Sequence, residues 1–257
     1  MRLRATAFLA AVAAANVGLC SASAAQPVDM GPPVDTLAPL PASASVSSPE
    51  LPQVDPLAPL ADADAKPDGP SAEAVQIINW VLASRDNGEV PFMVIDKVAA
   101  EVFVFDAKGE FVGKTAALVG SAVGDDSSPG VGDRELSNIA PEDRTTPAGR
   151  FVAKFGHAYG NQKVLWVDYH TSISMHPVIT SNKKEHRRQR LESVTPDDNR
   201  ITYGCINVPR KFYRSVVEPL FTGTSGVVYI LPETRPLQEV FLAFNARLTP
   251  ARAPGSF

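Results

Sequence analysis

The sequence predicts a mainly β domain with flanking helices. Segments rich in β-branched and aromatic residues recur over residues 89–235, and turn residues separate them. Helical patterns of apolar residues stand on either side, over 71–88 and 236–257. The sequence is 44% apolar, which is enough for a hydrophobic core. A coarse count gives roughly six or seven strands and three helices.

Residues 1–24 match the pattern of a secretory signal peptide. Two arginines precede an apolar run from Ala7 to Leu19, and the small residues of positions 22–24 follow it. The run is shorter than the roughly 18–20 residues that a membrane-spanning helix needs. We therefore expect cleavage after Ala24, export to the periplasm or cell envelope, and no membrane span in the mature protein.

Residues 25–70 are rich in Pro, Ala, Ser and Asp and contain no aromatic residue. Prolines at this density block helices and sheets and favour an extended chain. We therefore predict a disordered linker. The near-repeat of residues 34–40 and 54–60 carries Leu-Ala-Pro-Leu twice, which leaves a short docking motif as the alternative.

An amphipathic helix is expected over 71–88, with Ser71 as its N-cap. Its buried face would consist of the apolar residues at helical spacing, which are Val75, Ile78, Val81 and Leu82. The expected strands that follow are residues 92–96, 101–105, 111–119, 164–169, 171–175 and 227–231. Residues 120–141 are typical of a loop, and their glycines match no phosphate-binding pattern, so no nucleotide site is indicated.

Two further helical patterns lie in the last quarter of the chain. Apolar residues at helical spacing predict a helix over 210–218, which Pro219 would end. The pattern over 236–257 predicts a closing amphipathic helix that packs on the sheet. Its apolar residues are Leu237, Val240, Phe241, Phe244 and Leu248.

Cys205 is the single cysteine that remains once Cys20 leaves with the signal peptide. Exported proteins usually pair their cysteines, so a lone one is an intermolecular bridge, a reactive thiol or a small buried residue. Gly204 permits a tight turn before it, and Pro209 suits the first turn of the following helix. A helix N-terminus close to a thiol lowers its pKa, and free N–H groups there could hold an oxyanion.

Residues 202–207, Thr-Tyr-Gly-Cys-Ile-Asn, resemble the Ser/Thr-His-Gly-Cys-apolar-Asn/Arg motif of the L,D-transpeptidases, the YkuD-type family. Residues 145–151 resemble that family's Thr-Pro-x-Gly-x-Phe stretch. The resemblance covers roughly residues 90–232, within the predicted catalytic domain of residues 89–235, and implies a YkuD-like β-sandwich or barrel-like catalytic fold. One departure is Tyr203, which stands where the family usually has His.

The resemblance implies that Cys205 is the catalytic nucleophile. It also implies that the backbone at Tyr203 and Gly204 forms the turn and the oxyanion site, and that Thr202 and Asn207 bind substrate. A thiol nucleophile of this kind needs a general base, and the sequence offers four histidines for that role.

His176 is the expected general base. It ends an expected strand upstream of the cysteine, and in this it resembles the family's catalytic His. Pro177 follows it where the family often has Gly, and the long interval to the cysteine implies an inserted segment. His186 ranks second because it lies in a charged run, and His157 and His170 are expected at the surface or in packing.

Residues 183–190 carry five Lys and Arg in a protein whose formal net charge is −4. An exposed polar helix or loop is the simpler interpretation, and a lid whose cations meet substrate carboxylates is the alternative. Arg200 could likewise clamp a substrate carboxylate or pair with Asp197 and Asp198. The acidic balance of the whole chain argues against a general nucleic-acid binder.

These expectations combine into an exported cysteine acyltransferase that acts on peptidoglycan stem peptides by L,D-transpeptidation through a thioester on Cys205. An L,D-carboxypeptidase or amidase of the same fold and a catalytically weak peptidoglycan-binding module stay open as alternatives. No metal or other cofactor is expected, because the sequence has no Cys-x-x-Cys or His-Glu-x-x-His pattern.

Overall fold

The computed structural model describes residues 69–158 and 161–244. The expected signal peptide and residues 25–68 of the expected linker lie outside this part, as do residues 245–257 of the closing segment. Among the described residues, no helix is both long enough and apolar enough to cross a membrane.

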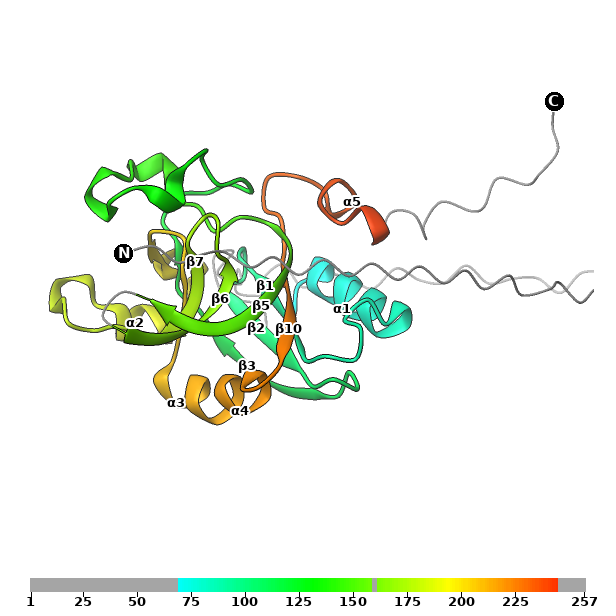
Figure 1. The fold of residues 1–257 in the computed structure, drawn as a ribbon. Helices are drawn as coiled ribbons and strands as arrows, with labels where there is room; N and C mark the ends of the chain where they lie inside the picture. Colours follow the sequence, from blue (N-terminus) through cyan, green and yellow to red (C-terminus); the bar gives the residue numbers. More distant parts are fainter. Residues whose placement is uncertain (1–68, 159–160, 245–257) are drawn as a thin grey trace, which may run out of the picture. The chain divides into compact units, whose positions relative to one another are not determined.

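The strands of the described part form an eight-stranded and a two-stranded sheet (Figure 1). The order in the larger sheet is β3-β2-β1-β10-β5-β6-β7-β9, and β4 pairs with β8 in the smaller one. The strands are β1 (Phe92–Asp96), β2 (Glu101–Phe105), β3 (Phe111–Ala116), β4 (Val119–Gly120), β5 (Gly149–Ala158), β6 (Gln162–Asp168), β7 (Ile173–Pro177), β8 (Arg200–Thr202), β9 (Ile206–Val208) and β10 (Ser225–Ile230). The helices are α1 (Ala72–Ser84), α2 (Arg187–Glu192), α3 (Arg210–Phe212), α4 (Glu218–Phe221) and α5 (Leu237–Val240).

The large sheet curls until its two edge strands approach each other. The chain leaves edge strand β3 and reaches Leu118, which forms an antiparallel bridge with Asn207 of β9, the strand at the other edge. Strand β4 follows at once and pairs in parallel with β8. The fold is therefore mainly β and barrel-like with flanking helices, which confirms the predicted fold class.

The central strands are buried on both faces. Neighbouring side chains of a strand point to opposite faces, so Met93 and Ile95 of β1 enter one apolar cluster while Phe92 and Val94 enter the other. The helical segment over 210–221 closes the first cluster, and α1 and α5 close the second (Figure 1). This double cover makes the sheet a rigid support for the site described below.

Helix α1 is capped as predicted but buries only part of the predicted face. Ser71 Oγ accepts a hydrogen bond from the amide of Ala74 at 3.1 Å. The ring of Trp80 packs edge-on against Tyr229 and Phe244, with centroids 6.0 Å away in both cases, and burial of this large ring sets the helix orientation. The buried residues are Ala74, Ile77, Trp80 and Val81. The residues of the predicted face that are exposed instead are Val75 and Leu82.

The helix predicted over 210–218 extends further than expected. Helix α3 continues through a π-helical turn over Tyr213–Val217 directly into α4, and Pro219 lies inside this segment. Proline lacks an N–H and crowds the carbonyl one turn earlier. A widened π turn immediately before it relieves both conflicts. The prediction that Pro219 ends the helix is therefore wrong.

Candidate active site

Cys205 lies on the turn between β8 and β9, as a free and partly exposed thiol. The sequence predicts the turn but neither of these three-residue strands. Because β9 and Pro209 separate Cys205 from Arg210, where α3 begins, the thiol is not at a helix N-terminus. The field of a helix end fades within about one turn. The acidity of this thiol must therefore have another source.

Parallel pairing of β7 with β9 brings His176 to the cysteine. His176 stands opposite Asn207 in the register of these two strands. Alternate residues of a strand share a face, so Ser174 and His176 lie on the same side of the sheet as Cys205 and Asn207. Ser174 Oγ lies 3.6 Å from Cys205 Sγ. We refer to Cys205 and His176 as the dyad.

Two buried threonines hold the turn in place. Thr202 Oγ1 donates to the carbonyl of Cys205 at 2.7 Å and accepts from the amide of Gly204 at 3.1 Å. Thr146 Oγ1 donates to the carbonyl of Gly204 at 2.8 Å and accepts from the amide of Gly120 at 2.8 Å. The Thr202 hydroxyl, expected to bind substrate, thus makes its hydrogen bonds inside the protein.

Gly204 is required by the turn in two ways. Its φ is +122°, a conformation that residues with a side chain rarely adopt. A Cβ atom at this position would also lie 2.6 Å from the carbonyl oxygen of Thr145 and 2.7 Å from Cδ1 of Ile173. The close approach of the 145–146 segment to the cysteine turn therefore depends on a glycine here.

The backbone amides of the turn differ in availability. That of Gly204 donates to Thr202. Within the part of the chain that the structure describes, the amides of Tyr203 and Cys205 have no hydrogen-bond acceptor. An oxyanion held at this turn would therefore draw on the Tyr203 and Cys205 amides rather than on that of Gly204.

The imidazole of His176 is bonded at both nitrogens. Nδ1 lies 3.0 Å from the carbonyl oxygen of Pro177, and Nε2 lies 3.1 Å from Nδ2 of Asn207. Asn207 is almost fully buried, and its Oδ1 accepts from Arg187 at 2.8 Å. The amide that was expected to bind substrate thus contacts the ring of the dyad.

The dyad changes the acidity of Cys205. Burial acts to raise the pKa of the thiol, but the nearby imidazole of His176, together with hydrogen bonds with Ser174, outweighs it. The net effect is a thiol pKa below its ordinary value, which favours the nucleophilic thiolate. The imidazole of His176, rather than a helix N-terminus, therefore lowers the pKa of the Cys205 thiol.

Tyr203 carries a cation on its ring. The guanidinium carbon of Arg144 lies 4.3 Å from the ring centroid, within the range of a cation–π contact. Nε and one terminal nitrogen of Arg144 also donate to the carbonyl of Ile139, at 3.2 and 3.1 Å. Tyr203, the residue that departs from the family motif, is thus held by a cation–π contact with Arg144 at the cysteine turn.

Arg200 pairs with Glu233 rather than with Asp197 or Asp198. The carboxylate of Glu233 also lies 3.4 Å from Nζ of Lys97. The Arg200 side chain is only 14% exposed and its guanidinium is engaged in this internal ion pair. The expected contact with a substrate carboxylate stays a prediction.

The buried ion pair of Lys97 and Asp125 contacts the cysteine turn through Thr146. Nζ of Lys97 lies 2.8 Å from Asp125 and donates to the carbonyl of Thr146 at 2.9 Å. Burial acts to raise the pKa of Asp125, but hydrogen bonds from Lys97, from Thr234 and from nearby amides outweigh it and hold that pKa well below its usual range. Thr146 thus connects this ionic cluster to Gly204.

The other three histidines are not part of the dyad. His157, His170 and His186 are exposed at the surface.

The cations of the basic run over 183–190 differ in how exposed they are. Most of its cations are exposed, whereas Arg187 is largely buried, with 13% of its side chain exposed. The exposed-loop interpretation therefore fits most of the run but not Arg187.

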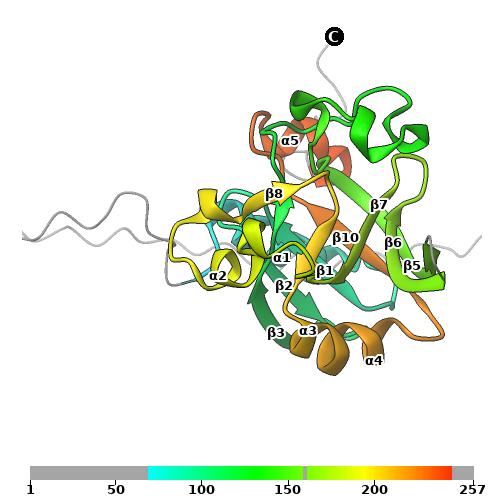
Figure 2. The same cartoon turned by 90° about the vertical axis from the view of Figure 1, so that its left-hand side faces the viewer.

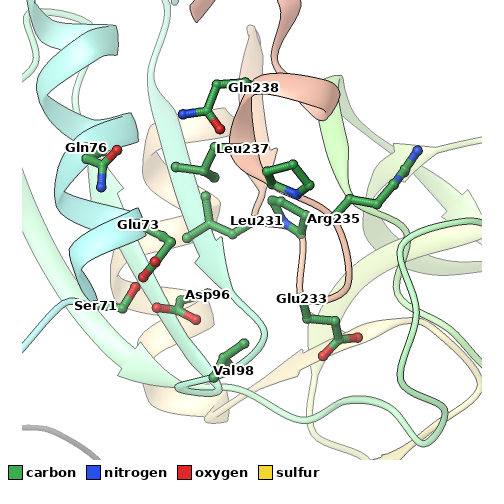
Figure 3. Close-up of a pocket in the computed structure, with 12 residues that line it drawn as sticks. Ser71, Glu73, Gln76, Asp96, Val98, Leu231, Glu233, Arg235, Leu237 and Gln238 are labelled. Carbon is green, nitrogen blue, oxygen red and sulfur yellow. The ribbon is translucent and has the colours of Figure 1, made fainter. Parts of the chain in front are cut away.

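A cavity of about 430 Å³ lies between the start of α1 and the segment that leads from β10 to α5 (Figure 3). Carboxylates of Glu73, Asp96 and Glu233 are among its lining groups, and neither residue of the dyad lines it.

Within the described residues, no group of three or more His, Cys, Asp and Glu side chains is placed to hold a metal ion.

Several residues of the site, Arg144 among them, were not identified from the sequence. Ser174 precedes His176 by two positions in an expected strand, so strand alternation could have found it. Thr146 lies in the Thr-Pro stretch that carried the resemblance. Lys97 and Arg187 gave no local signal, because each meets its partner only through the fold.

No protein-family model and no curated protein matches this sequence. Among solved structures, the chain is similar to an L,D-transpeptidase from Mycobacterium smegmatis, with 15% identity, a TM-score of 0.34, and coverage of 55% of this chain and 58% of that one. The catalytic domain of the E. faecium L,D-transpeptidase gives 16% identity, a TM-score of 0.32, and coverage of 56% and 98%. The helical cell shape determining protein Pgp2 from Campylobacter jejuni gives 14% identity, a TM-score of 0.38, and coverage of 62% of this chain and 57% of that one. The match thus spans less than two thirds of the M. smegmatis and C. jejuni chains.

Proposed function

We propose that this protein is an exported cysteine acyltransferase that acts on peptidoglycan stem peptides by L,D-transpeptidation. The observation that carries the proposal is the parallel register of β7 and β9, which sets His176 beside the turn of Cys205. The motif resemblance of residues 202–207 supplies the substrate class. Export rests on the signal-like pattern of residues 1–24.

The first half of the reaction forms a thioester. Nε2 of His176 takes the proton of Cys205, and the thiolate attacks the carbonyl carbon of an L,D-peptide bond. The amides of Tyr203 and Cys205 hold the oxyanion of the tetrahedral intermediate. When this intermediate collapses, the C–N bond breaks and His176 returns the proton to the departing amine of the D-amino acid.

The second half releases the acyl group. The amine of a second stem peptide attacks the thioester carbonyl, His176 takes a proton from that amine, and the C–S bond breaks to restore the thiol. The product is a cross-link. If water attacks instead, the same thioester gives an L,D-carboxypeptidase or amidase product.

In this proposal the buried polar residues position the dyad rather than bind substrate. Thr202 and Thr146 fix the turn, and Asn207 fixes the imidazole. Arg144, stacked on Tyr203 beside the cysteine turn, is the cation placed to meet a substrate carboxylate.

The test is incubation of the purified protein with muropeptides of defined structure, with products resolved by mass. We expect a dimer cross-linked through an L,D bond. We also expect no product from Cys205→Ala and a turnover lowered about 10²–10⁴-fold by His176→Ala. A shortened monomer alone would instead identify the carboxypeptidase. An unchanged digest would favour the non-catalytic binding module.

A further inference from the structure

Arg187 connects residues 178–199, the segment between β7 and β8, to the dyad. It is the first residue of α2, which is labelled at the left of Figure 2. One terminal nitrogen of its guanidinium donates to Oδ1 of Asn207 at 2.8 Å, and its Nε lies 2.5 Å from a carboxylate oxygen of Glu185. A largely buried arginine is therefore held on the residue that contacts His176.

The charge of Arg187 decides which way the Asn207 amide points. A guanidinium has five N–H donors and no acceptor, so the atom that meets it at 2.8 Å must be the carbonyl oxygen of the amide. The NH₂ group then has to face the opposite direction, toward Nε2 of His176. Asn207 is 1% exposed, so bulk water cannot substitute for either partner.

The orientation of that amide decides where the imidazole proton sits. An NH₂ group can only donate to the ring, so Nε2 must carry a lone pair. In neutral His176 the proton then lies on Nδ1, from which it is donated to the carbonyl of Pro177 at 3.0 Å. The three contacts form one chain in which each donor is matched to an acceptor.

We propose that Arg187 is a positioning residue that, through the Asn207 amide, keeps the proton of neutral His176 on Nδ1 and leaves Nε2 free to accept one. This inference rests on the proposed role of His176 as general base. In the reaction the proton from Cys205 Sγ replaces the Asn207 N–H as the partner of Nε2. The other charged or titratable groups along this chain of contacts are the Cys205 thiol and the Glu185 carboxylate.

Long-range ¹H–¹⁵N spectra of the ¹⁵N-histidine-labelled protein test the proposal, because they distinguish protonated from unprotonated ring nitrogens. The His176 signals are assigned by their loss in His176→Gln. We expect Nδ1 to be protonated and Nε2 unprotonated in the wild type. Arg187→Met should lose this pattern, because the freed amide can turn its oxygen toward Nε2, and Arg187→Lys should keep it.

Two further variants sharpen the result. Asn207→Asp offers Nε2 only an acceptor, so it should place a proton on Nε2 even with Arg187 in place, and it serves if Arg187→Met does not fold. Arg188→Met removes an exposed cation of the same helix and should change nothing.

A wild-type His176 with its proton on Nε2 would overturn the proposal. So would a folded Arg187→Met protein with unchanged ring nitrogens. Since the spectra need no turnover, failure of the tautomer assay and failure of acyl transfer are separate results.

Discussion

At the scale of single residues, Gly204 sets the geometry on which the dyad depends. We predict that Gly204→Ala destabilises the protein by more than the ~1–3 kcal/mol that a strained φ alone costs. The added Cβ would meet the backbone oxygen of Thr145 at 2.6 Å, which cannot move without disturbing Thr146. Urea unfolding gives the loss of stability, and the muropeptide assay gives the loss of turnover.

Gly223→Ala is the matched control for that prediction. Gly223 also has a positive φ, of +82°, but nothing lies within 4 Å of the position its Cβ would take. It should therefore show only the cost of the backbone conformation and should leave turnover intact. Equal losses of stability in the two variants would show that the close approach to Thr145 does not constrain the turn.

Thr146 joins three separate parts of the chain at the site, so its hydroxyl should matter more than its volume. Thr146→Val leaves the carbonyl of Gly204 without its donor and the amide of Gly120 without its acceptor. We expect a loss of about 1–3 kcal/mol for each buried group left unpaired. Thr222→Val, at an exposed position, should cost little in the same urea titration.

The sequence pointed to the residues whose chemistry is local and missed those whose role comes from a partner. Cys205 and His176 were proposed from a motif and from residue type. By contrast, the internal hydrogen bonds of the Thr202 hydroxyl could not be predicted, since a hydroxyl next to a nucleophile gives no sign of its direction. Arg187 could not be separated from its basic neighbours, because only the fold brings it to Asn207.

At the scale of elements, helix α1 offers a direct check of the buried face. Trp80→Ala should destabilise the protein by about 3–5 kcal/mol, because it leaves a cavity between the helix and the sheet. Val75→Ala, on the face that the sequence favoured, should cost far less, since Val75 is 40% exposed. Thermal or urea unfolding measures both. A larger loss of stability for Val75→Ala than for Trp80→Ala would show that the face predicted from periodicity is the buried one.

Long strands were predictable and the shortest ones were not. Strands β1 and β2 match their predicted ranges, because each is five residues of apolar and aromatic character. Strands β8 and β9 have three residues each, too few for alternation to be recognised. The sequence around them therefore indicates only a turn that leads into a helix.

At the scale of the whole described part, the buried Lys97–Asp125 pair joins the end of β1 to the loop before β5 and to the segment after β10. The folded-state pKa of Asp125 is depressed, so its contribution to stability is present above the unfolded value, near 3.9. This contribution is lost as pH falls from there through the folded value. We predict that the free energy of unfolding decreases steeply with pH below about 4.

Asp125→Asn should flatten that dependence on pH, and should cost roughly 3–5 kcal/mol near neutrality because Lys97 loses its buried partner. Asp126→Asn is the control, since the Asp126 side chain is 79% exposed in its pair with Arg235. Urea unfolding at a series of pH values measures both. An Asp125→Asn protein with the slope of the wild type would show that another carboxylate governs acid unfolding.

The closure of the sheet lay beyond what the sequence could predict. The class, mainly β with flanking helices, followed from local pattern. The bridge from Leu118 to Asn207 joins positions nearly ninety residues apart in the sequence, and neither position carries a sign of the other. The same bridge holds β9, the strand that directly follows Cys205. The pairing that closes the sheet therefore also positions the cysteine turn.

The most direct test of the central claim, that His176 ionises Cys205, is the pH dependence of alkylation at this thiol. The rate of iodoacetamide labelling, followed by intact mass, reports the thiolate fraction. The account predicts a wild-type midpoint below about 8.5, the value of an ordinary thiol, and a shift upward in His176→Ala. A midpoint at or above the ordinary value that does not respond to His176→Ala would contradict it.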